Sequence, residues 1–260
     1  MAIVTLLSDF GLKDSYVAEM KAVILSINPS ARTVDVTHEI PKYDIRCGAF
    51  VLASAARYFP IRTIHLAVVD PGVGSKRKPI IIETEKSAYV GPDNGLLVLA
   101  AKNEGIQKVF EITEKRFMMS DVSNTFHGRD VFSPTAAYIS KGVRAEEIGK
   151  PLENYFEPSF SSVSMKEGFI ECEVLHVDSF GNVVTNVRPD DLFAINVRSG
   201  SSLRLGKRRF SFLQTYSDVT KGSLLGLIGS HGFFEISANQ RDAARLLRLK
   251  VGKKLRLLVS

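Results

Sequence analysis

Cysteine is scarce in this sequence, and long apolar runs are missing. The two cysteines, Cys47 and Cys172, lie far apart along the chain and in apolar patterns, so we expect buried free thiols. A cysteine-based metal site would need more ligands than these two. The longest apolar runs, at 66–69 and 96–101, fall far short of the roughly 20 residues of a membrane helix, so we expect no membrane partner. The N-terminus has no basic region and reaches Asp9 early, which predicts no secretory signal and a cytoplasmic location.

Motifs that identify several common enzyme classes are also missing. There is no Gly-x-x-x-x-Gly-Lys-Ser/Thr phosphate loop, no Gly-x-Ser-x-Gly elbow and no His-Glu-x-x-His helix. The segment 91–95 does not match the dinucleotide fingerprint. A serine hydrolase therefore has no support. Scattered aspartates with one histidine would suit a divalent-metal phosphohydrolase, although none has the local spacing of a ligand set.

Acidic residues are fewer than basic ones, with 28 Asp and Glu against 34 Lys and Arg, so the net charge is +6. Such a balance can indicate a nucleic-acid partner. The excess lies late, at 207–209 and 241–256, where basic residues alternate with leucine as on the solvent face of a strand. No helix-turn-helix, zinc-finger or aromatic RNA-binding signature accompanies it, so we expect no nucleic acid.

The first half of the chain alternates strand and helix patterns. Continuous apolar runs at 2–8 and 63–69 predict buried strands. Helical spacing and N-capping aspartates (Asp14, Asp44 and Asp130) predict helices at 14–27, 44–59 and near 131–140. Further strands are expected at 33–37, 79–84, 87–90 and 107–113. Together these patterns predict an N-terminal α/β domain over 1–158, a mostly parallel sheet flanked by helices.

The pattern changes after Lys150. Prolines and serines without a clean period favour a linker, which we place at 159–168. From 169 to 260 the apolar patterns are short and punctuated by glycines, which predicts a smaller antiparallel β-barrel-like domain. Its strands are expected at 169–178, 183–187, 202–205, 209–214, 224–228, 233–237 and 254–259.

Polar side chains cluster where the predicted strands end. Asp9 follows the first strand, Asp70 follows the strand at 63–69, and Asp93 lies in a glycine-flanked turn. Ligands of open α/β sheets bind outside the carboxyl ends of the strands, so these residues are site candidates. Aspartate next to Pro and Gly is also a strong turn former that needs no chemistry. His127, in a glycine-containing loop before a helix, fits a structural or a catalytic role.

The strand-end motifs belong to a longer series. In chain order the series is Ser8-Asp9-Phe10-Gly11, Asp35-Val36-Thr37-His38, Asp70-Pro71-Gly72-Val73-Gly74 with Arg77, Gly91-Pro92-Asp93-Asn94-Gly95, Phe126-His127-Gly128-Arg129-Asp130, Asp178-Ser179-Phe180-Gly181-Asn182, and Glu235-Ile236 with Asn239. This series resembles the S-adenosyl-L-methionine hydrolase (adenosine-forming) family, or SAM hydroxide adenosyltransferases, which is related to bacterial fluorinase and chlorinase. The resemblance extends from residue 3 to about residue 244.

The resemblance implies a fold, an assembly and a reaction. The family has an N-terminal α/β domain and a C-terminal β-barrel-like domain, and it forms homotrimers. S-adenosyl-L-methionine (SAM) lies between the N-domain of one subunit and the C-domain of the next. Water attacks the ribose 5′ carbon in line with the sulfonium, which yields adenosine and L-methionine. SAM is the substrate, and neither a cofactor nor a metal is implied.

The resemblance also assigns residues. It places the catalytic triad on Asp70, Arg77 and His127, which would orient and activate the water. It gives the remaining substrate contacts to Asp9 at the ribose hydroxyls, Tyr43 and Phe126 around sugar and base, Asp178 and Ser230 at the methionine ends, and Asn182 with Glu235 and Ala238 at adenine. In the halogenating relatives an arginine follows the serine equivalent, where this chain has His231-Gly232.

Two alternatives share the same motifs. A SAM-dependent halide adenosyltransferase would need an uncharged halide pocket, and Asp70 and His127 stand where that pocket would lie. Gly128 replaces the halide-contacting serine of the fluorinase. A non-catalytic adenosine- or SAM-binding protein also fits the sequence.

Overall fold

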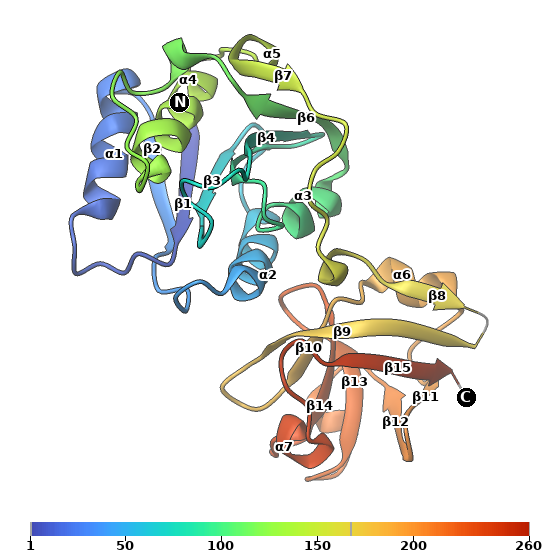
Figure 1. The fold of residues 1–260 in the computed structure, drawn as a ribbon. Coiled ribbons are helices and arrows are strands. Elements are labelled where there is room, and N and C mark those ends of the chain that lie inside the picture. The colour runs from blue at the N-terminus through green and yellow to red at the C-terminus, as the bar shows by residue number, and fades with distance from the viewer. Residues whose placement is uncertain (1, 167, 260) are drawn as a thin grey trace. The chain divides into compact units, whose positions relative to one another are not determined.

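The chain folds into two units that divide between Pro158 and Ser159. The computed structural model describes residues 2–166 and 168–259. The first unit is a sheet covered by helices and the second is a small barrel (Figure 1), which confirms the predicted fold class. The segment 159–168, expected as a linker, contains the short strand β8 (Ser164–Lys166), which pairs with a long strand of the barrel.

The sheet of the first unit has a parallel half and an antiparallel half. Its order is β2-β1-β3-β5-β4-β6-β7. The parallel strands are β1 (Ile3–Ser8), β2 (Arg32–Thr37), β3 (Ile64–Val68) and β5 (Ala88–Pro92). The antiparallel strands are β4 (Pro79–Thr84), β6 (Ile106–Ile112) and β7 (Gly149–Pro151). β4 and β5 run antiparallel because a tight turn joins them, in which the Thr84 N–H donates to the Ser87 carbonyl over 3.0 Å.

Helices cover both faces of this sheet (Figure 1). On one face α1 (Tyr16–Ile27) packs with α4 (Ser133–Ser140), and α2 (Ile45–Ala56) and α3 (Val98–Glu104) cover the other. The short α5 (Ala145–Ile148) precedes β7. β1 and β3 are therefore buried on both faces, as their continuous apolar runs predict. Each fully buried Leu, Ile or Val side chain stabilises the fold by about 1.5–3 kcal/mol.

The beginnings of the helices agree only partly with the predicted caps. Asp44 caps α2 by accepting a hydrogen bond from Cys47 N at 2.9 Å, as predicted. Asp14 is not the cap of α1, because Ser15 precedes that helix and makes no side-chain cap. The capping role of Asp130 is wrong as well, since Asp130 lies inside a π-helical turn over Gly128–Phe132 that leads into α4.

The second unit is a closed barrel of seven strands with β8 added at one edge. The order is β10-β14-β13-β12-β11-β15-β9, and β9 pairs with β10 to close it. Neighbours are antiparallel except β12 and β13. The strands are β9 (Phe169–Val177), β10 (Val183–Thr185), β11 (Ser202–Leu205), β12 (Arg208–Phe212), β13 (Leu224–Ile228), β14 (Phe234–Ala238) and β15 (Lys254–Val259). Two short helices, α6 (Pro189–Ala194) and α7 (Ala243–Leu247), lie between strands.

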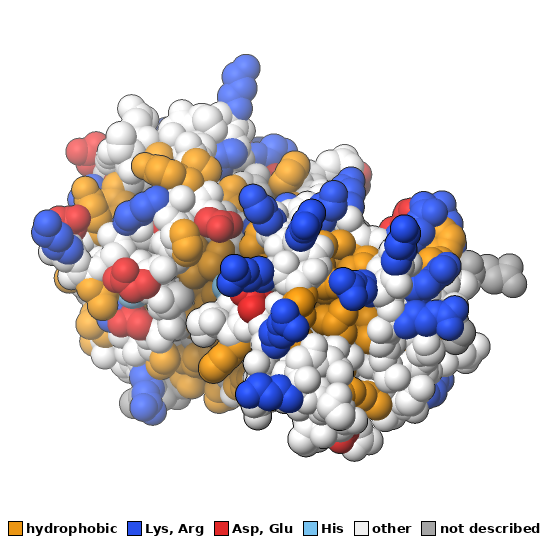
Figure 2. Space-filling model, turned by 90° about the horizontal axis from the view of Figure 1, so that it is seen from below, with side chains coloured by type: hydrophobic (Ala, Val, Ile, Leu, Met, Phe, Trp, Pro, Cys, Tyr) orange, Lys and Arg blue, Asp and Glu red, His pale blue; other side chains and the backbone are white. Residues whose placement is uncertain are grey.

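All of the net positive charge comes from the second unit. Residues 1–158 contain 19 basic and 19 acidic residues, whereas residues 159–260 contain 15 basic and 9 acidic ones. On β15, Lys254 and Arg256 are exposed while Leu255 and Leu257 are buried, which confirms the predicted solvent face of that strand. Figure 2 shows Lys and Arg side chains outnumbering acidic ones on one face of the molecule.

The structure bears on the two cysteines and on the short apolar runs of the sequence. Cys47 and Cys172 are both free thiols, and Cys172 is buried while Cys47 is partly buried. Across residues 2–166 and 168–259, no helix has the length and apolarity needed to span a bilayer.

Candidate active site

The parallel half of the first sheet brings two aspartates to one edge. Ser8 at the end of β1 lies opposite Val68 at the end of β3. Asp9 follows β1 directly, and Asp70 follows β3 after one residue. Parallel neighbours end at the same edge of a sheet, so both carboxylates stand at the edge where ligands of such sheets bind.

Asp70, Arg77 and His127 form one continuous chain of contacts. Arg77 Nε donates to both carboxylate oxygens of Asp70, at 3.1 and 2.9 Å, and Arg77 Nη2 lies 2.6 Å from Asp70 Oδ2. The same Nη2 lies 2.8 Å from Nδ1 of His127. Arg77 therefore joins the strand end that carries Asp70 to the loop before α4 that carries His127. This pairing of a guanidinium with a carboxylate is charge-assisted and geometrically specific.

The guanidinium of Arg77 is buried and has donors to spare. Only 9% of the Arg77 side chain and 5% of the Asp70 side chain are exposed. The guanidinium carbon lies 5.2 Å from the ring centroid of Phe132, which packs beneath it. Arg77 Nη1 is buried and has no hydrogen-bond partner among the described residues. A buried donor of this kind is costly unless something binds to it, which makes Nη1 a candidate contact for water or substrate.

His127 is held as a neutral imidazole. Burial lowers the pKa of His127, and the neighbouring Arg77 charge lowers it further, so the ring is uncharged at neutral pH. Arg77 has only donors, so Nδ1 of His127 accepts the hydrogen bond. The ring proton therefore sits on Nε2. His127 presents a hydrogen-bond donor on the side of the ring away from Arg77.

Asp9 is buried and linked to the loop that follows β2. Its side chain accepts a hydrogen bond from Tyr43 N at 2.9 Å, and its carbonyl accepts one from the Lys42 ammonium. The backbone of Tyr43 has a positive φ of 67°, which turns its chain toward Asp9. Tyr43 itself is 70% exposed.

An aromatic cluster lies beside these residues. The ring centroid of Phe126 is 5.7 Å from that of Phe10 and 5.1 Å from that of Tyr16, and both pairs meet edge to face. Gly128 packs against the cluster, and a Cβ there would lie 3.2 Å from the Phe126 ring and 3.3 Å from the sulfur of Met20. Phe126 was predicted as a site residue. Phe10 and Tyr16 were not, although Phe10 belongs to the motif around Asp9 and Tyr16 follows that motif in the sequence.

Among the predicted residues of the barrel, Asp178 and Asn182 form a tight turn between β9 and β10. Asp178 Oδ1 accepts hydrogen bonds from Phe180 N (2.9 Å) and Asn182 N (2.8 Å), while Oδ2 accepts one from Asn182 Nδ2 (2.9 Å). Asn182 is buried, and Phe180 at the tip of the turn is 78% exposed. The turn thus fixes both polar side chains and presents an aromatic ring to its surroundings.

Glu235 is buried, on the face of β14 opposite to Phe234 and Ile236, which belong to the core of the barrel. Its Oε1 accepts hydrogen bonds from Tyr216 Oη (2.6 Å) and Ser237 Oγ (2.7 Å), and its Oε2 lies 2.9 Å from His231 Nε2. Burial acts to raise the pKa of Glu235, but hydrogen bonds from His231, Tyr216 and Ser237 outweigh it and hold that pKa below its ordinary value. The carboxylate therefore orients the three side chains that hydrogen-bond to it.

The remaining two predicted residues flank this buried carboxylate. Ser230 is exposed in the turn before β14, and His231 in that turn accepts a hydrogen bond from Phe233 N at 3.1 Å. Ala238 is buried at the end of β14. The predicted residues thus fall into two groups, one on each unit.

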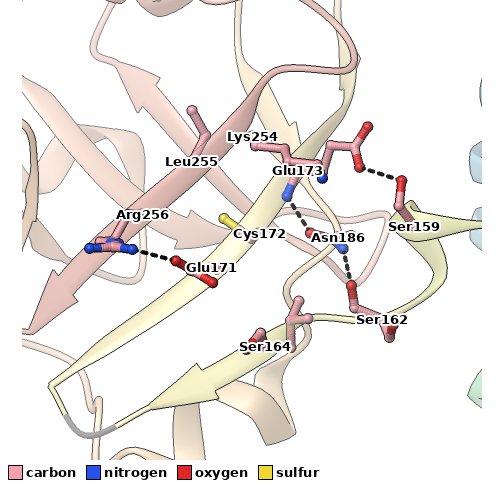
Figure 3. Close-up of a pocket in the computed structure, with 11 residues that line it drawn as sticks. Ser159, Ser162, Ser164, Glu171, Cys172, Glu173, Asn186, Lys254, Leu255 and Arg256 are labelled. Carbon is pink, nitrogen blue, oxygen red and sulfur yellow. Dashed lines mark hydrogen bonds and ion pairs between the residues drawn. The ribbon is translucent and has the colours of Figure 1, made fainter.

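A separate pocket of about 460 Å³ lies in the barrel unit, between β9, β15 and the segment 159–164 (Figure 3). Its lining mixes polar and apolar side chains. Arg256 Nη2 lies 2.6 Å from Glu171 Oε1, and Ser159 Oγ donates to Glu173 at 3.0 Å. None of the predicted site residues lines it. In the part of the chain that the structure describes, no three His, Cys, Asp or Glu side chains lie together as a metal site would require.

Comparisons with known proteins agree with the motif series. Residues 4–149 match the model of the SAM hydroxide adenosyltransferase N-terminal domain, and residues 172–256 match that of the C-terminal domain. A Methanocaldococcus jannaschii protein named (R)-S-adenosyl-L-methionine hydrolase is 37% identical, covering 95% of this chain and 92% of its own. A Thermus thermophilus protein of the same name is 36% identical, covering 97% and 98%.

More distant and structural relatives complete the comparison. A fluorinase from an Actinoplanes species is 25% identical and covers 96% of this chain and 95% of its own. The crystal structure of an uncharacterized conserved protein from Thermotoga maritima superposes with a TM-score of 0.83 at 36% identity, covering 99% of this chain and all of the other. The hydrolases are therefore more similar to this chain than the fluorinase is.

Proposed function

Because this chain belongs to the SAM hydroxide adenosyltransferase family, we propose that it hydrolyses S-adenosyl-L-methionine to adenosine and L-methionine. Its 36–38% identical relatives carry the name (R)-S-adenosyl-L-methionine hydrolase, so the substrate is the diastereomer with R configuration at sulfur. The observation that carries the proposal is the continuous contact chain of Asp70, Arg77 and His127 at the edge of the sheet.

The chemistry needs little more than placement of one water. The oxygen of water forms a bond to the ribose 5′ carbon while the bond from that carbon to sulfur breaks. The electron pair of the broken bond stays on sulfur, so methionine leaves as a neutral thioether, and the water loses one proton. Holding the water in line with the leaving sulfur supplies most of the rate, because orientation replaces a bimolecular encounter. No metal or cofactor takes part in this scheme.

The three residues divide the work by their hydrogen-bonding capacity. Neutral His127 donates from Nε2 to the oxygen of the water, and buried Nη1 of Arg77 is a second donor near it. Arg77 stays charged and cannot take a proton. The carboxylate of Asp70 is the acceptor of the three and receives the proton of the water.

The same groups disfavour a halide as nucleophile. A halide beside the buried carboxylate of Asp70 would be repelled and poorly solvated. Gly128 has no hydroxyl, and its packing against Phe126 leaves no easy room for one. These features separate the chain from a halide adenosyltransferase.

Substrate contacts come from both units. Asp9 takes the ribose hydroxyls, Phe126 and Tyr43 pack around the nucleoside, and the barrel supplies the rest through Asp178, Asn182, Ser230 and the stretch around Glu235 and Ala238. SAM carries a net positive charge, and the barrel is net basic, so affinity comes from local carboxylates rather than from long-range attraction. We propose a homotrimer in which the first unit of one subunit and the barrel of the next enclose SAM. The two free thiols suit a reducing, cytoplasmic location.

The deciding experiment is product analysis with both sulfur diastereomers. The purified chain is given (R)- or (S)-SAM in oxygen-18 water, with and without chloride and with EDTA. We expect adenosine labelled at its 5′ oxygen, faster from the R form, unchanged by EDTA and free of chlorinated nucleoside. Unlabelled adenosine, a chlorinated product or strong EDTA inhibition reversed by metal would each overturn the proposal, and so would binding without turnover.

A further inference from the structure

A chain of hydrogen bonds crosses the ends of β1 and β2 next to Asp9. Ser8 Oγ lies 2.7 Å from Nδ1 of His38, and Nε2 of His38 lies 3.1 Å from Oδ1 of Asp35. Ser8 is fully buried, and His38 is 3% exposed. Phe10 N donates to Ser8 Oγ at 3.3 Å. None of these contacts involves the three residues assigned to the chemistry.

The donors and acceptors of this hydrogen-bond network are compatible with only one placement of the protons. The carboxylate of Asp35 can only accept, so Nε2 of His38 carries the ring proton. Nδ1 then accepts from the Ser8 hydroxyl, whose oxygen accepts from the backbone of Phe10. Lys21 Nζ lies 2.6 Å from the other oxygen of Asp35 and anchors the outer end. Every polar group in the chain is thereby satisfied, which a buried network requires in order to stabilise one geometry.

The order Ser–His–Asp is also that of a hydrolase triad, but this one has no access to a substrate. Ser8 has no exposed surface, and its oxygen is engaged by Phe10 N. A nucleophilic role is therefore excluded, and the network acts on the backbone around it.

That backbone carries Asp9. His38 holds the segment a second time through its carbonyl, which accepts a hydrogen bond from Gly11 N at 2.7 Å. Asp9 is thus flanked by Ser8 and Phe10, which the His38 ring orders, and by Gly11, which the His38 backbone holds. The carboxylate of Asp9 itself accepts a hydrogen bond from Tyr43 N at 2.9 Å.

We propose that His38 is a positioning residue for the ribose contact of Asp9, acting through Ser8. This inference rests on the proposed function, because it takes Asp9 to bind the ribose hydroxyls. A displaced carboxylate loses most of the directional strength of its hydrogen bonds to those hydroxyls. If His38 has this role, its substitution should weaken the binding only of ligands that carry the ribose hydroxyls.

The experiment compares two substitutions that each keep half of the imidazole. In His38→Asn the amide occupies the place of Nδ1 and retains the contact with Ser8. In His38→Gln it reaches the place of Nε2, retains the contact with Asp35 and leaves the Ser8 hydroxyl without its acceptor. Ser8→Ala removes the same contact from the other side. Adenosine and 2′,3′-dideoxyadenosine are titrated calorimetrically into the full chain, and SAM hydrolysis gives kcat and KM.

We expect adenosine to bind about tenfold more weakly to His38→Gln and Ser8→Ala, and nearly normally to His38→Asn. Dideoxyadenosine should bind all four proteins alike, and KM for SAM should rise while kcat stays within about twofold. Equal losses for the two nucleosides, or equal behaviour of Asn and Gln, would show a merely structural histidine and overturn the inference. If the wild-type chain prefers adenosine but releases no methionine from SAM, the proposed function fails while this inference stands. If it does not prefer adenosine, the inference fails.

Discussion

Arg77 and His127 share a hydrogen bond of 2.8 Å between Nη2 and Nδ1, and that nitrogen of Arg77 also lies 2.6 Å from Asp70. One guanidinium therefore sets the orientation of both a carboxylate and an imidazole. Because Arg77 contacts both partners, a substitution at any one of the three residues removes a contact that orients another. The predictions for the site follow from this arrangement.

Asp70→Asn should lower kcat for SAM hydrolysis by about 10²–10⁴-fold. The amide keeps the turn propensity of aspartate, and the turn itself is held by Val73 N donating to the Asp70 carbonyl at 3.2 Å. The melting temperature should fall somewhat, because the buried Arg77 loses its partner charge, so turnover is compared well below that temperature. Steady-state kinetics and thermal unfolding of the same preparation test this. Near-normal turnover at saturating SAM would mean that Asp70 only forms the turn.

The effects of the three residues should not add. Asp70→Asn, Arg77→Gln and His127→Ala each break the same contact chain, so the double and triple variants should be little slower than the worst single one. Adenosine binding should persist in all of them, because Asp9 and Phe126 remain. Multiplying losses across the series would instead indicate three independent roles.

The imidazole of His127 should titrate at a pKa below the usual 6.5, because burial and then the Arg77 charge both disfavour its protonated form. Nuclear magnetic resonance of the ring protons gives this pKa directly. In Arg77→Gln the positive charge is gone while Asp70 remains, so the pKa should rise. If the imidazole must be neutral, the wild-type rate will hold down to the lowered pKa and fall below it. A wild-type pKa at or above 6.5 would contradict the neutral imidazole.

Much of this site could be anticipated from residue order, because the carboxyl ends of buried strands are identifiable from apolar runs alone. Asp9 and Asp70 were placed in this way, and Asp44 was correctly identified as a cap. Asp130 shows where the approach fails. Its position before a helical pattern suggests an N-cap, yet an extra residue in the turn makes it π-helical, and the Asp130 carboxylate instead accepts from Ser123 N and pairs with Arg129.

Hydrogen bonds between residues far apart in the sequence could not be predicted from residue order either. The hydrogen bond from Tyr216 to Glu235, 19 positions later in the sequence, depends on how two segments of the barrel pack together. The antiparallel half of the first sheet depends likewise on the tight turn after β4. The assignment of the substrate contacts to individual residues stays a prediction.

The buried His65 should make the protein less stable in mild acid. Its ring is fully buried, stacks on Tyr89 with centroids 4.8 Å apart and bonds to Thr5 Oγ1 at 2.8 Å. Burial lowers the pKa of His65 to about 4. The unfolded chain binds this proton at about pH 6.5 and the folded chain only near 4, so stability is lost as the pH falls between these values, by about 3 kcal/mol.

Urea unfolding at a series of pH values measures this loss. His65→Phe keeps the aromatic stack but cannot be protonated, so it should be less stable at pH 7 yet lose less stability between pH 6.5 and 4. A wild-type protein and a His65→Phe variant with the same pH slope would show that other groups cause the acid sensitivity.

Gly128→Ser should weaken hydrolysis without creating halogenation. The added Cβ would lie 3.2 Å from the Phe126 ring and 3.3 Å from Met20, closer than ordinary contacts, so the aromatic cluster must shift. We expect KM for SAM to rise several-fold and no chlorinated nucleoside to form in chloride, because the carboxylate of Asp70 remains paired with Arg77 in the site. Gly128→Ala carries the same Cβ without a hydroxyl and should match it. Chlorination by the serine variant would show that the hydroxyl alone determines the nucleophile.

Glu235→Gln should weaken the binding of SAM more than the binding of adenosine. The carboxylate fixes His231, and His231 in turn accepts from Phe233 N, so together they hold the turn that presents Ser230. An amide can match only part of this pattern, because it must place NH₂ toward either His231 or the hydroxyls of Tyr216 and Ser237. If Ser230 binds the methionine carboxylate, and if the adenine contact assigned around Glu235 does not use its engaged carboxylate, SAM should bind about tenfold more weakly while adenosine binds nearly as before. Tyr216→Phe leaves the His231 contact intact and should affect neither ligand much. Equal losses for SAM and adenosine in Glu235→Gln would mean that the buried carboxylate supports the barrel as a whole and not the turn at Ser230.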